Sequence, residues 1–189
     1  MLAGIWLAML LGGTGKLDRT VYELLYAGHR PVLVSLARGF TALGEPTVLI
    51  GACLLCALWL WSVGRVRLGV TLLLIALVGR GLSEVQKIWV ARPRPEFQPH
   101  LVLVKTQSFP SGHATSSMIF YLTLALALTA HSRWRREAVV GALLLSLLIG
   151  TSRVMLGVHW PSDVIGGWSF GMMWVLLTLK PAERLLRAV

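Results

Sequence analysis

A short stretch near the C-terminal end, residues 152–163, combines an arginine, a histidine and an aspartate in a chain with few charges. It reads SRVMLGVHWPSD, whereas only 14% of the 189 residues are charged and 56% are hydrophobic. His159 and Asp163 are four residues apart, so a helix beginning at or just before His159 would let the carboxylate reach an imidazole nitrogen. Such a contact fixes the tautomer and supports the cation that forms when the other nitrogen attacks. The spacing indicates an activated histidine nucleophile.

Three basic residues in this and another segment could bind a phosphate group. Lys87, Arg94 and Arg153 are donors without acceptor capacity, and an arginine can bind two phosphate oxygens at once. Two histidines and an aspartate could instead hold a metal ion, because imidazole and carboxylate are common ligands. Three cations around the same point would repel a divalent ion, so we expect no metal and no cofactor.

The tetrapeptide PSGH, residues 110–113, stands where an apolar segment begins. Backbone N–H groups and the positive end of a helix dipole can point at an anion there, which suits Ser111 and Gly112 for phosphate binding. His113 comes from a different segment than His159 and is free to donate a proton to a leaving oxygen. The chain thus offers a nucleophile, an acid and a ring of donors for phosphoryl transfer.

The composition indicates that membrane helices position these residues. A mean hydropathy of +0.71 and long apolar runs are typical of an integral membrane protein and exclude an ordinary soluble domain. The formal net charge of +10 would suggest nucleic acid in a soluble protein, but cationic loops beside membrane spans give the same excess and suit anionic lipids. We therefore expect membrane lipids, and no nucleic acid, as partners.

The apolar segments predict an all-α membrane bundle formed by one domain, residues 1–189. Residues 1–13 are too short to span a bilayer upright, so we expect either a short or tilted sixth helix or a start codon placed too late. Residues 17–25 and 31–43 predict N-terminal amphipathic helices at the interface. Five transmembrane helices are expected at residues 46–63, from 68 onward, at 113–130, at 138 to about 155, and at 161–179.

A polar stripe interrupts the helix that begins near residue 68. Arg80, Glu84 and Lys87 follow at i, i+4 and i+7, which places them on one helix face. Charged residues within membrane segments normally face a bundle interior or a water-filled site. When the predicted helices are placed across the membrane, the three segments that carry the candidate site residues all fall at one membrane face. Basic turns and the basic end of the chain fall at the other, which the positive-inside rule makes cytoplasmic: Arg65, Arg67, Arg133, Arg135, Arg136, Lys180, Arg184 and Arg187.

Three ordered motifs within residues 87–163 resemble the signature of the type 2 phosphatidic acid phosphatase family. That signature is a lysine followed after six residues by Arg-Pro, then Pro-Ser-Gly-His, then Ser-Arg, five residues, His, three residues and Asp. The chain has KIWVARPRP at 87–95, PSGH at 110–113 and SRVMLGVHWPSD at 152–163. The six-residue spacing selects Arg94 and leaves Arg92 as an additional cation. Ordered motifs with fixed spacing are far more specific than any one of them alone.

The resemblance implies roles that agree with those argued from the residues. His159 would take the phosphoryl group, Asp163 would orient it, His113 would be the general acid, and water would hydrolyse the phosphohistidine. The phosphate oxygens would be held, without a metal, by Lys87, Arg94, Ser111, Gly112 and Arg153. A ring of fixed cations can stabilise the charge on the equatorial oxygens during in-line transfer.

The expected activity is hydrolysis of a terminal phosphate from a membrane lipid phosphate or diphosphate at the extracytoplasmic face, in a bacterial inner membrane. Undecaprenyl diphosphate and a glycerophospholipid such as phosphatidylglycerophosphate or phosphatidic acid are rival substrates. A lipid phosphotransferase with the same nucleophile is the alternative, and a non-enzymatic lipid-phosphate binding or transport protein is a third reading. The oligomeric state stays open, because Gly167-x-x-x-Gly171 is only a weak dimer signal.

Overall fold

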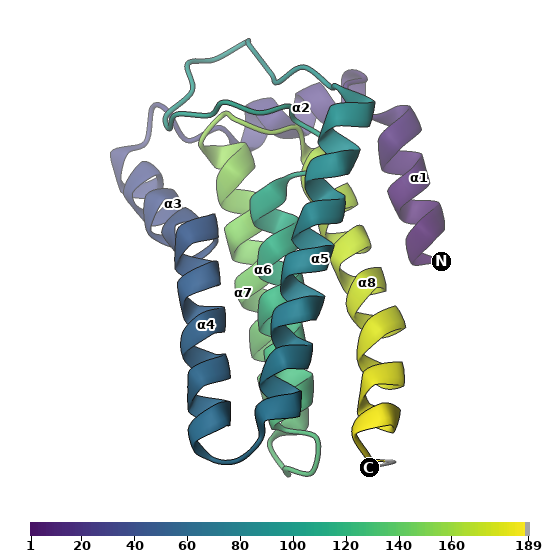
Figure 1. Ribbon diagram of the computed structural model, residues 1–189. Coiled ribbons are helices and arrows are strands. Elements are labelled where there is room, and N and C mark those ends of the chain that lie inside the picture. The colour runs from purple at the N-terminus through teal and green to yellow at the C-terminus, as the bar shows by residue number, and fades with distance from the viewer. Residues whose placement is uncertain (188–189) are drawn as a thin grey trace.

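A computed structural model describes the backbone of residues 1–187 and the side chains of residues 1–179; in this part of the chain all regular structure is helical (Figure 1). The side chains of Lys180, Arg184 and Arg187 lie outside the described residues. The helices are α1 (Leu2–Gly12), α2 (Lys16–Leu25), α3 (Pro31–Leu43), α4 (Pro46–Ser62), α5 (Val66–Val90), α6 (Gly112–Leu128), α7 (Arg135–Met155) and α8 (Pro161–Arg187). The expected all-α helical bundle is confirmed.

Prolines open three of these helices, as the sequence indicated. Pro31, Pro46 and Pro161 each occupy the first helical position, where the missing N–H has no intrahelical acceptor to lose. Helix α5 ends differently, with Ala91 in the left-handed conformation (φ 48°) just before the proline-rich loop that leads to α6. The α5–α6 loop, residues 91–111, and the α7–α8 connection, residues 156–160, lie at the same end of the bundle (Figure 1).

The N-terminal helices surround that end of the bundle. Helix α1 packs against α8, and α3 packs against α7. Helix α2 is amphipathic as expected, but Leu17 and Leu24 are exposed, and the residues it buries are Asp18 and Tyr22. Asp18 accepts hydrogen bonds from the Ser162 backbone N–H (2.8 Å) and hydroxyl, which caps the beginning of α8. Leu17 and Leu24 thus face away from the protein, as apolar residues of a helix lying on a membrane would, whereas Leu25 packs against the bundle.

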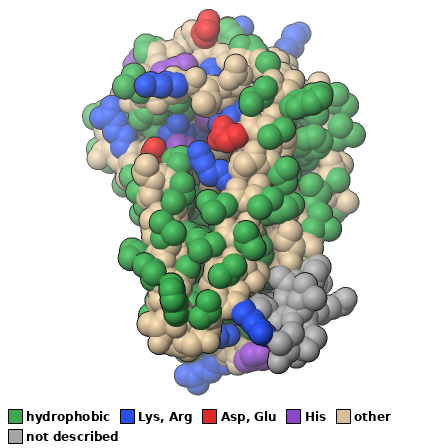
Figure 2. Space-filling view, viewed as in Figure 1, with side chains coloured by type: hydrophobic (Ala, Val, Ile, Leu, Met, Phe, Trp, Pro, Cys, Tyr) green, Lys and Arg blue, Asp and Glu red, His purple; other side chains and the backbone are tan. Residues whose placement is uncertain are grey.

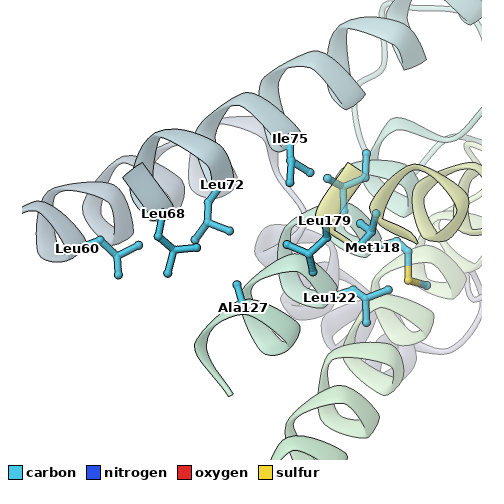
Figure 3. Close-up of a cluster of buried hydrophobic side chains, with 10 residues drawn as sticks. Leu60, Leu68, Leu72, Ile75, Met118, Leu122, Ala127 and Leu179 are labelled. Atoms are coloured by element: carbon cyan, nitrogen blue, oxygen red, sulfur yellow. The ribbon is translucent and has the colours of Figure 1, made fainter. Parts of the chain in front are cut away.

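Helix α6 runs through the centre of the bundle, between α5, α7 and α8 (Figure 1). The largest buried cluster joins α4, α5, α6 and α8 near the opposite end from the polar loops (Figure 3). It contains Leu60, Leu68, Leu72, Ile75, Met118, Ile119, Leu122, Ala127, Val175 and Leu179. Gly167 and Gly171 let α8 approach α6 closely, because a Cβ at either position would lie 2.9 Å from a backbone oxygen of Ser111 or Thr115. The Gly167-x-x-x-Gly171 motif therefore forms a helix–helix contact within this chain.

Three helices of the described chain are long and apolar enough to span a membrane by themselves: α5, α7 and α8 over Pro161–Leu179. Helices α3 and α4, bent by 42° at a short break, make a fourth span when counted together. Helix α6, with 17 residues, is apolar but shorter, and it lies enclosed by its neighbours. Hydrophobic side chains cover the flank of the bundle, and charged ones gather toward its ends (Figure 2). The protein is an integral membrane protein.

Candidate active site

A pocket of about 280 Å³ opens at the end of the bundle where the polar segments meet. Its lining comes from the end of α3, the beginning of α4, the second half of α5, the loop after α5, the beginning of α6, the end of α7 and the connection between α7 and α8. Six of the eight predicted site residues line it: Lys87, Arg94, Gly112, His113, Arg153 and His159. The other two, Ser111 and Asp163, are buried outside the lining set.

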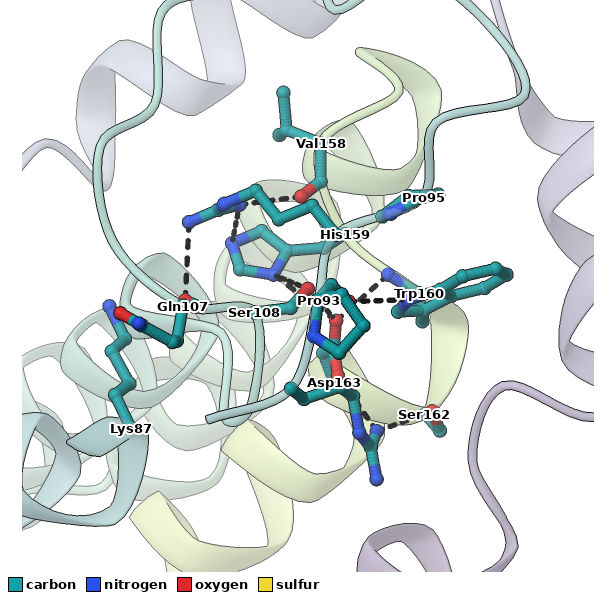
Figure 4. A network of polar contacts seen from close by, with 12 residues as sticks. Lys87, Pro93, Pro95, Gln107, Ser108, Val158, His159, Trp160, Ser162 and Asp163 are labelled. Atoms are coloured by element: carbon teal, nitrogen blue, oxygen red, sulfur yellow. Dashed lines mark hydrogen bonds and ion pairs between the residues drawn. The ribbon is translucent and has the colours of Figure 1, made fainter. Parts of the chain in front are cut away.

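His159 lies just before α8 with its side chain only 2% exposed. Its Nδ1 is 3.4 Å from Asp163 Oδ2 and 3.4 Å from Ser108 Oγ, and its Nε2 is 3.1 Å from Arg94 Nη1 (Figure 4). A guanidinium can only donate, so Nε2 accepts this hydrogen bond and the ring proton is on Nδ1. Burial first, and then the nearby cations, hold the pKa of His159 well below 6.5. The pocket-side nitrogen, Nε2, is therefore unprotonated, and its lone pair is directed at the Arg94 guanidinium.

Asp163, in the first turn of α8, is completely buried and fully engaged. It accepts hydrogen bonds from the Trp160 backbone N–H (2.9 Å) and the Ser108 hydroxyl, and it forms an ion pair with Arg92 Nη1 at 2.8 Å (Figure 4). These partners fix the carboxylate beside His159. The Asp163 carboxylate reaches His159 Nδ1 across four residues, as the spacing predicted. Helix α8 begins only at Pro161, however, so His159 itself precedes the helix.

Arg92, set aside in the sequence as an additional cation, links the N-terminal helix to Asp163. Its Nη2 donates to the carbonyls of Met9 (2.9 Å) and Leu10 (2.8 Å) in the last turn of α1, and its Nη1 also donates to Ser162 Oγ (3.0 Å). Carbonyls in a last helical turn have no intrahelical donor, so Arg92 satisfies two of them. The guanidinium thus binds α1 and α8 to one another at the site.

Lys87 and Arg94, the two cations that the signature selects in the first motif, both contact Thr106 in the loop between α5 and α6. Arg94 donates from Nε to the Thr106 carbonyl (2.8 Å) and from Nη1 to the Val158 carbonyl. Burial lowers the pKa of Arg94, and Asp163 opposes this. Lys87, at the end of the polar stripe on α5, is 3.2 Å from Thr106 Oγ1 and 3.5 Å from Glu84 Oε1. Thr106 therefore accepts hydrogen bonds from both the Lys87 ammonium and the Arg94 guanidinium, which places the two cations beside each other in the pocket.

Arg153 and the beginning of α6 also line the pocket. Arg153 is buried in α7; its Nη1 donates to Thr41 Oγ1 at 2.6 Å, and its Nε has no partner within the described residues. Gly112 keeps the pocket open, because a Cβ there would lie 3.2 Å from Lys87 Nζ. The backbone N–H of Ser111 donates to the Asp163 carbonyl (3.0 Å), which ties α6 to α8. The Ser111 hydroxyl finds no partner among the described residues.

His113, in the first turn of α6, lines the same pocket as His159. Its Nε2 is 3.2 Å from Oε2 of Glu45, the residue that precedes α4. The pocket is therefore lined by a histidine with an unprotonated Nε2, a histidine paired with a carboxylate, and the three cations Lys87, Arg94 and Arg153. An anion with several oxygens, such as a phosphate group, fits this arrangement.

Sequence reasoning missed four residues that support the site: Arg92, Ser108, Thr41 and Glu45. A signal existed for Glu45, because a carboxylate between Gly44 and Pro46 stands at a predicted helix break between two apolar segments. Arg92 was visible only as an extra charge. Ser108 and Thr41 carry no signal, since a lone hydroxyl residue in a loop or an apolar helix is ordinary.

Comparison with known proteins agrees with this arrangement. The model of the PAP2 superfamily matches residues 68–185. Phosphatidylglycerophosphatase B of Bacillus subtilis is 32% identical over 174 residues, which cover 90% of this chain and 85% of that protein. Undecaprenyl-diphosphatase of Sulfolobus acidocaldarius is 32% identical over 135 residues, covering 65% and 63%.

A solved structure shows that the likeness extends to the fold. The crystal structure of a transmembrane PAP2 type phosphatidylglycerolphosphate phosphatase from Bacillus subtilis matches with a TM-score of 0.90 at 28% identity, over 97% of this chain and 94% of that one. The family region, residues 68–185, contains all three sequence motifs and all eight predicted site residues. The chain therefore belongs to the PAP2 superfamily.

Proposed function

We propose that this protein is a membrane lipid phosphatase that removes a terminal phosphate through a phosphohistidine on His159, without a metal. The observation that carries the proposal is the His159 environment: Nδ1 faces a buried carboxylate, and Nε2 faces a pocket lined by Lys87, Arg94 and Arg153. The cations bind the phosphate oxygens and repel a divalent ion, which supports the metal-free mechanism. The lipid-phosphatase names of the relatives support the same activity.

The reaction proceeds in two steps. His159 Nε2 attacks phosphorus in line with the ester oxygen; the P–N bond forms as the P–O bond breaks, and His113 transfers a proton to the leaving oxygen. The Nδ1–H remains directed at Asp163, which stabilises the cationic ring. Water then attacks the phosphohistidine, His113 accepts a proton from it, and phosphate leaves from the cationic pocket.

The proposed substrate is phosphatidylglycerophosphate, with undecaprenyl diphosphate as the rival. Phosphatidylglycerophosphatase B is similar over 90% of this chain, whereas the similarity to the undecaprenyl-diphosphatase covers 65%. The positive-inside rule supports a pocket at the extracytoplasmic face of the inner membrane, because Arg65, Arg67 and the α6–α7 turn lie at the other end of the bundle. A cysteine placed in the loop at 91–109 should then be labelled by an impermeant reagent from outside the cell.

Phosphate release by the purified protein tests the activity. We expect turnover of phosphatidylglycerophosphate, phosphatidic acid or undecaprenyl diphosphate without an added acceptor, inhibition by vanadate, and no loss in chelator. A need for an acceptor would favour the phosphotransferase reading. Acid-labile radioactive phosphate bound to the protein, absent from His159→Ala, would identify the intermediate. A His159→Ala variant with undiminished turnover would refute the mechanism.

A further inference from the structure

The break between α3 and α4 reaches into the pocket from outside the matched family region. The two helices bend by 42° at Gly44 and Glu45, and Tyr121 of α6 fixes the break by donating to the Leu43 carbonyl at 2.9 Å. Gly44 permits close contact with the site, because a Cβ there would collide with Ile149 Cγ2 and lie 3.2 Å from His113 Cδ2. We refer to residues 41–46 as the elbow.

The elbow contributes two polar side chains, and each contacts a site residue on another helix. Thr41 accepts the hydrogen bond from Arg153, and Glu45 lies 3.2 Å from His113 Nε2. Thr41 lies in the last turn of α3, and Glu45 lies in the break just before α4. Both residues lie outside residues 68–185 and outside the three motifs.

The charges around His113 give Glu45 a specific task. The groups facing this imidazole from α5, α7 and the α7–α8 connection are cationic or neutral: Arg80, Lys87, Arg153 and His159. A general acid has to carry its proton before the chemistry, and burial first, then the neighbouring cations, oppose an imidazolium at His113. Glu45, at the beginning of α4, supplies the carboxylate in contact with this ring. Glu84 also lines the pocket, but it pairs with Arg80 and Lys87 at 3.5 Å each.

We propose that Glu45 is a positioning residue that holds His113 in its proton-bearing form for donation to the leaving group of the lipid phosphate. The proposal rests on the phosphatase function and deepens it. Glu45 binds the Nε2–H, so the proton that reaches the leaving oxygen as the P–O bond breaks is the one on Nδ1. Glu45 stays ionised throughout and accepts no proton in the net reaction. This arrangement mirrors that of Asp163, which binds Nδ1 of His159 and leaves Nε2 to react.

The leaving group distinguishes this role from a structural one. An alkyl phosphate needs protonation of its leaving oxygen, whereas p-nitrophenolate departs without it. Glu45→Gln keeps a hydrogen-bond acceptor but removes the charge. Since general acid catalysis contributes about 10²–10⁴-fold, we expect kcat/KM for phosphatidic acid to fall about 10–100-fold, and that for p-nitrophenyl phosphate by no more than about threefold. Equal losses with both substrates, or no loss with either, would overturn the proposal.

Two further variants make the assignment specific. Glu23→Gln is the matched control: Glu23 has the same side-chain exposure as Glu45, 51%, and pairs with Arg19 on α2, away from the pocket. It should leave both activities unchanged. In a double-mutant cycle, Glu45→Gln added to His113→Ala should cause no further loss with phosphatidic acid, because the two residues act as one unit. Additive losses would contradict a role through His113.

The outcomes separate this proposal from the proposed function. If the wild-type protein releases no phosphate from any lipid, or if His159→Ala keeps its activity, the phosphatase function itself fails. If the wild type is active and His113→Ala loses alkyl phosphate turnover, but Glu45→Gln matches Glu23→Gln, only the role of Glu45 fails.

Discussion

Replacing Arg92 by methionine should destabilise the protein more than replacing any exposed arginine. Methionine keeps much of the side-chain volume but removes four donated hydrogen bonds, two to carbonyls of α1 and one each to Ser162 and Asp163. It leaves a fully buried carboxylate without its cation. Removing one partner of a buried ion pair typically costs about 3–5 kcal/mol, so we expect the free energy of unfolding to fall by that amount.

Arg19 provides a matched control for this experiment. Its Nε is 3.0 Å from a carboxylate oxygen of Glu23, and its guanidinium lies 4.0 Å from the Phe97 ring centroid; Arg92 likewise pairs with a carboxylate and lies 4.4 Å from the Phe109 centroid. The pairs differ in exposure, because the Arg19 side chain is 54% exposed and Arg92 only 7%. Arg19→Met should therefore cost only about 0–1 kcal/mol.

Reversible unfolding in mixed detergent micelles, followed by far-ultraviolet circular dichroism, measures both variants. The double variant Arg92→Met with Asp163→Asn should lose less stability than the sum of the single variants, because the buried charge that needed Arg92 is gone. We expect a coupling energy of at least about 1.5 kcal/mol, within the range for groups in direct contact. Equal costs for Arg92→Met and Arg19→Met, or additive single effects, would refute the buried-pair reasoning.

Three other predictions concern the nucleophile, the pH dependence and the packing of α8. His159→Ala should lower phosphate release at least about 10³-fold while the unfolding transition stays cooperative, because it removes the nitrogen on which the proposed covalent intermediate forms; turnover and unfolding measured on one preparation check this. The lowered pKa of His159 keeps its imidazole neutral as pH falls through 6.5, so kcat/KM for p-nitrophenyl phosphate should hold there and decline only at more acid pH; an acid limb centred at 6.5 for both this substrate and phosphatidic acid would contradict the burial argument. Gly167→Val should cost about 1–3 kcal/mol of stability, since even a Cβ would lie 2.9 Å from the Ser111 carbonyl oxygen; its neighbour in the same helix, Ile165→Val, is exposed and should change stability little.

The helices follow closely from the sequence because their signals are local. Pro31, Pro46 and Pro161 mark helix starts whatever the rest of the chain does, and the apolar runs between polar turns set the lengths. The number of membrane-spanning helices follows less directly from the sequence. Helix α6 is enclosed by α5, α7 and α8, so it need not meet the length that a lipid-facing helix requires.

The site was predictable where spacing within one segment determines geometry, and not where distant segments meet. His159 and Asp163 are adjacent because four residues separate them, and the convergence of three segments follows from helices ending at one face. The contact between Arg92 and the last turn of α1 depends on how α1 docks against α8, which no local pattern encodes. Ser108 reaches Asp163 only because of the path of an irregular loop.

The placement of the pocket at one end of α5 limits which lipids the protein can reach. Lys87 lies about 32 Å along this helix from Val66, at about 1.5 Å per residue, which is close to the thickness of a bilayer's hydrocarbon layer. A head group in the leaflet at the pocket end lies level with the cations, whereas one in the other leaflet is a full hydrocarbon thickness away. Lipid phosphates made in the far leaflet would have to be flipped across the bilayer before this protein could act on them.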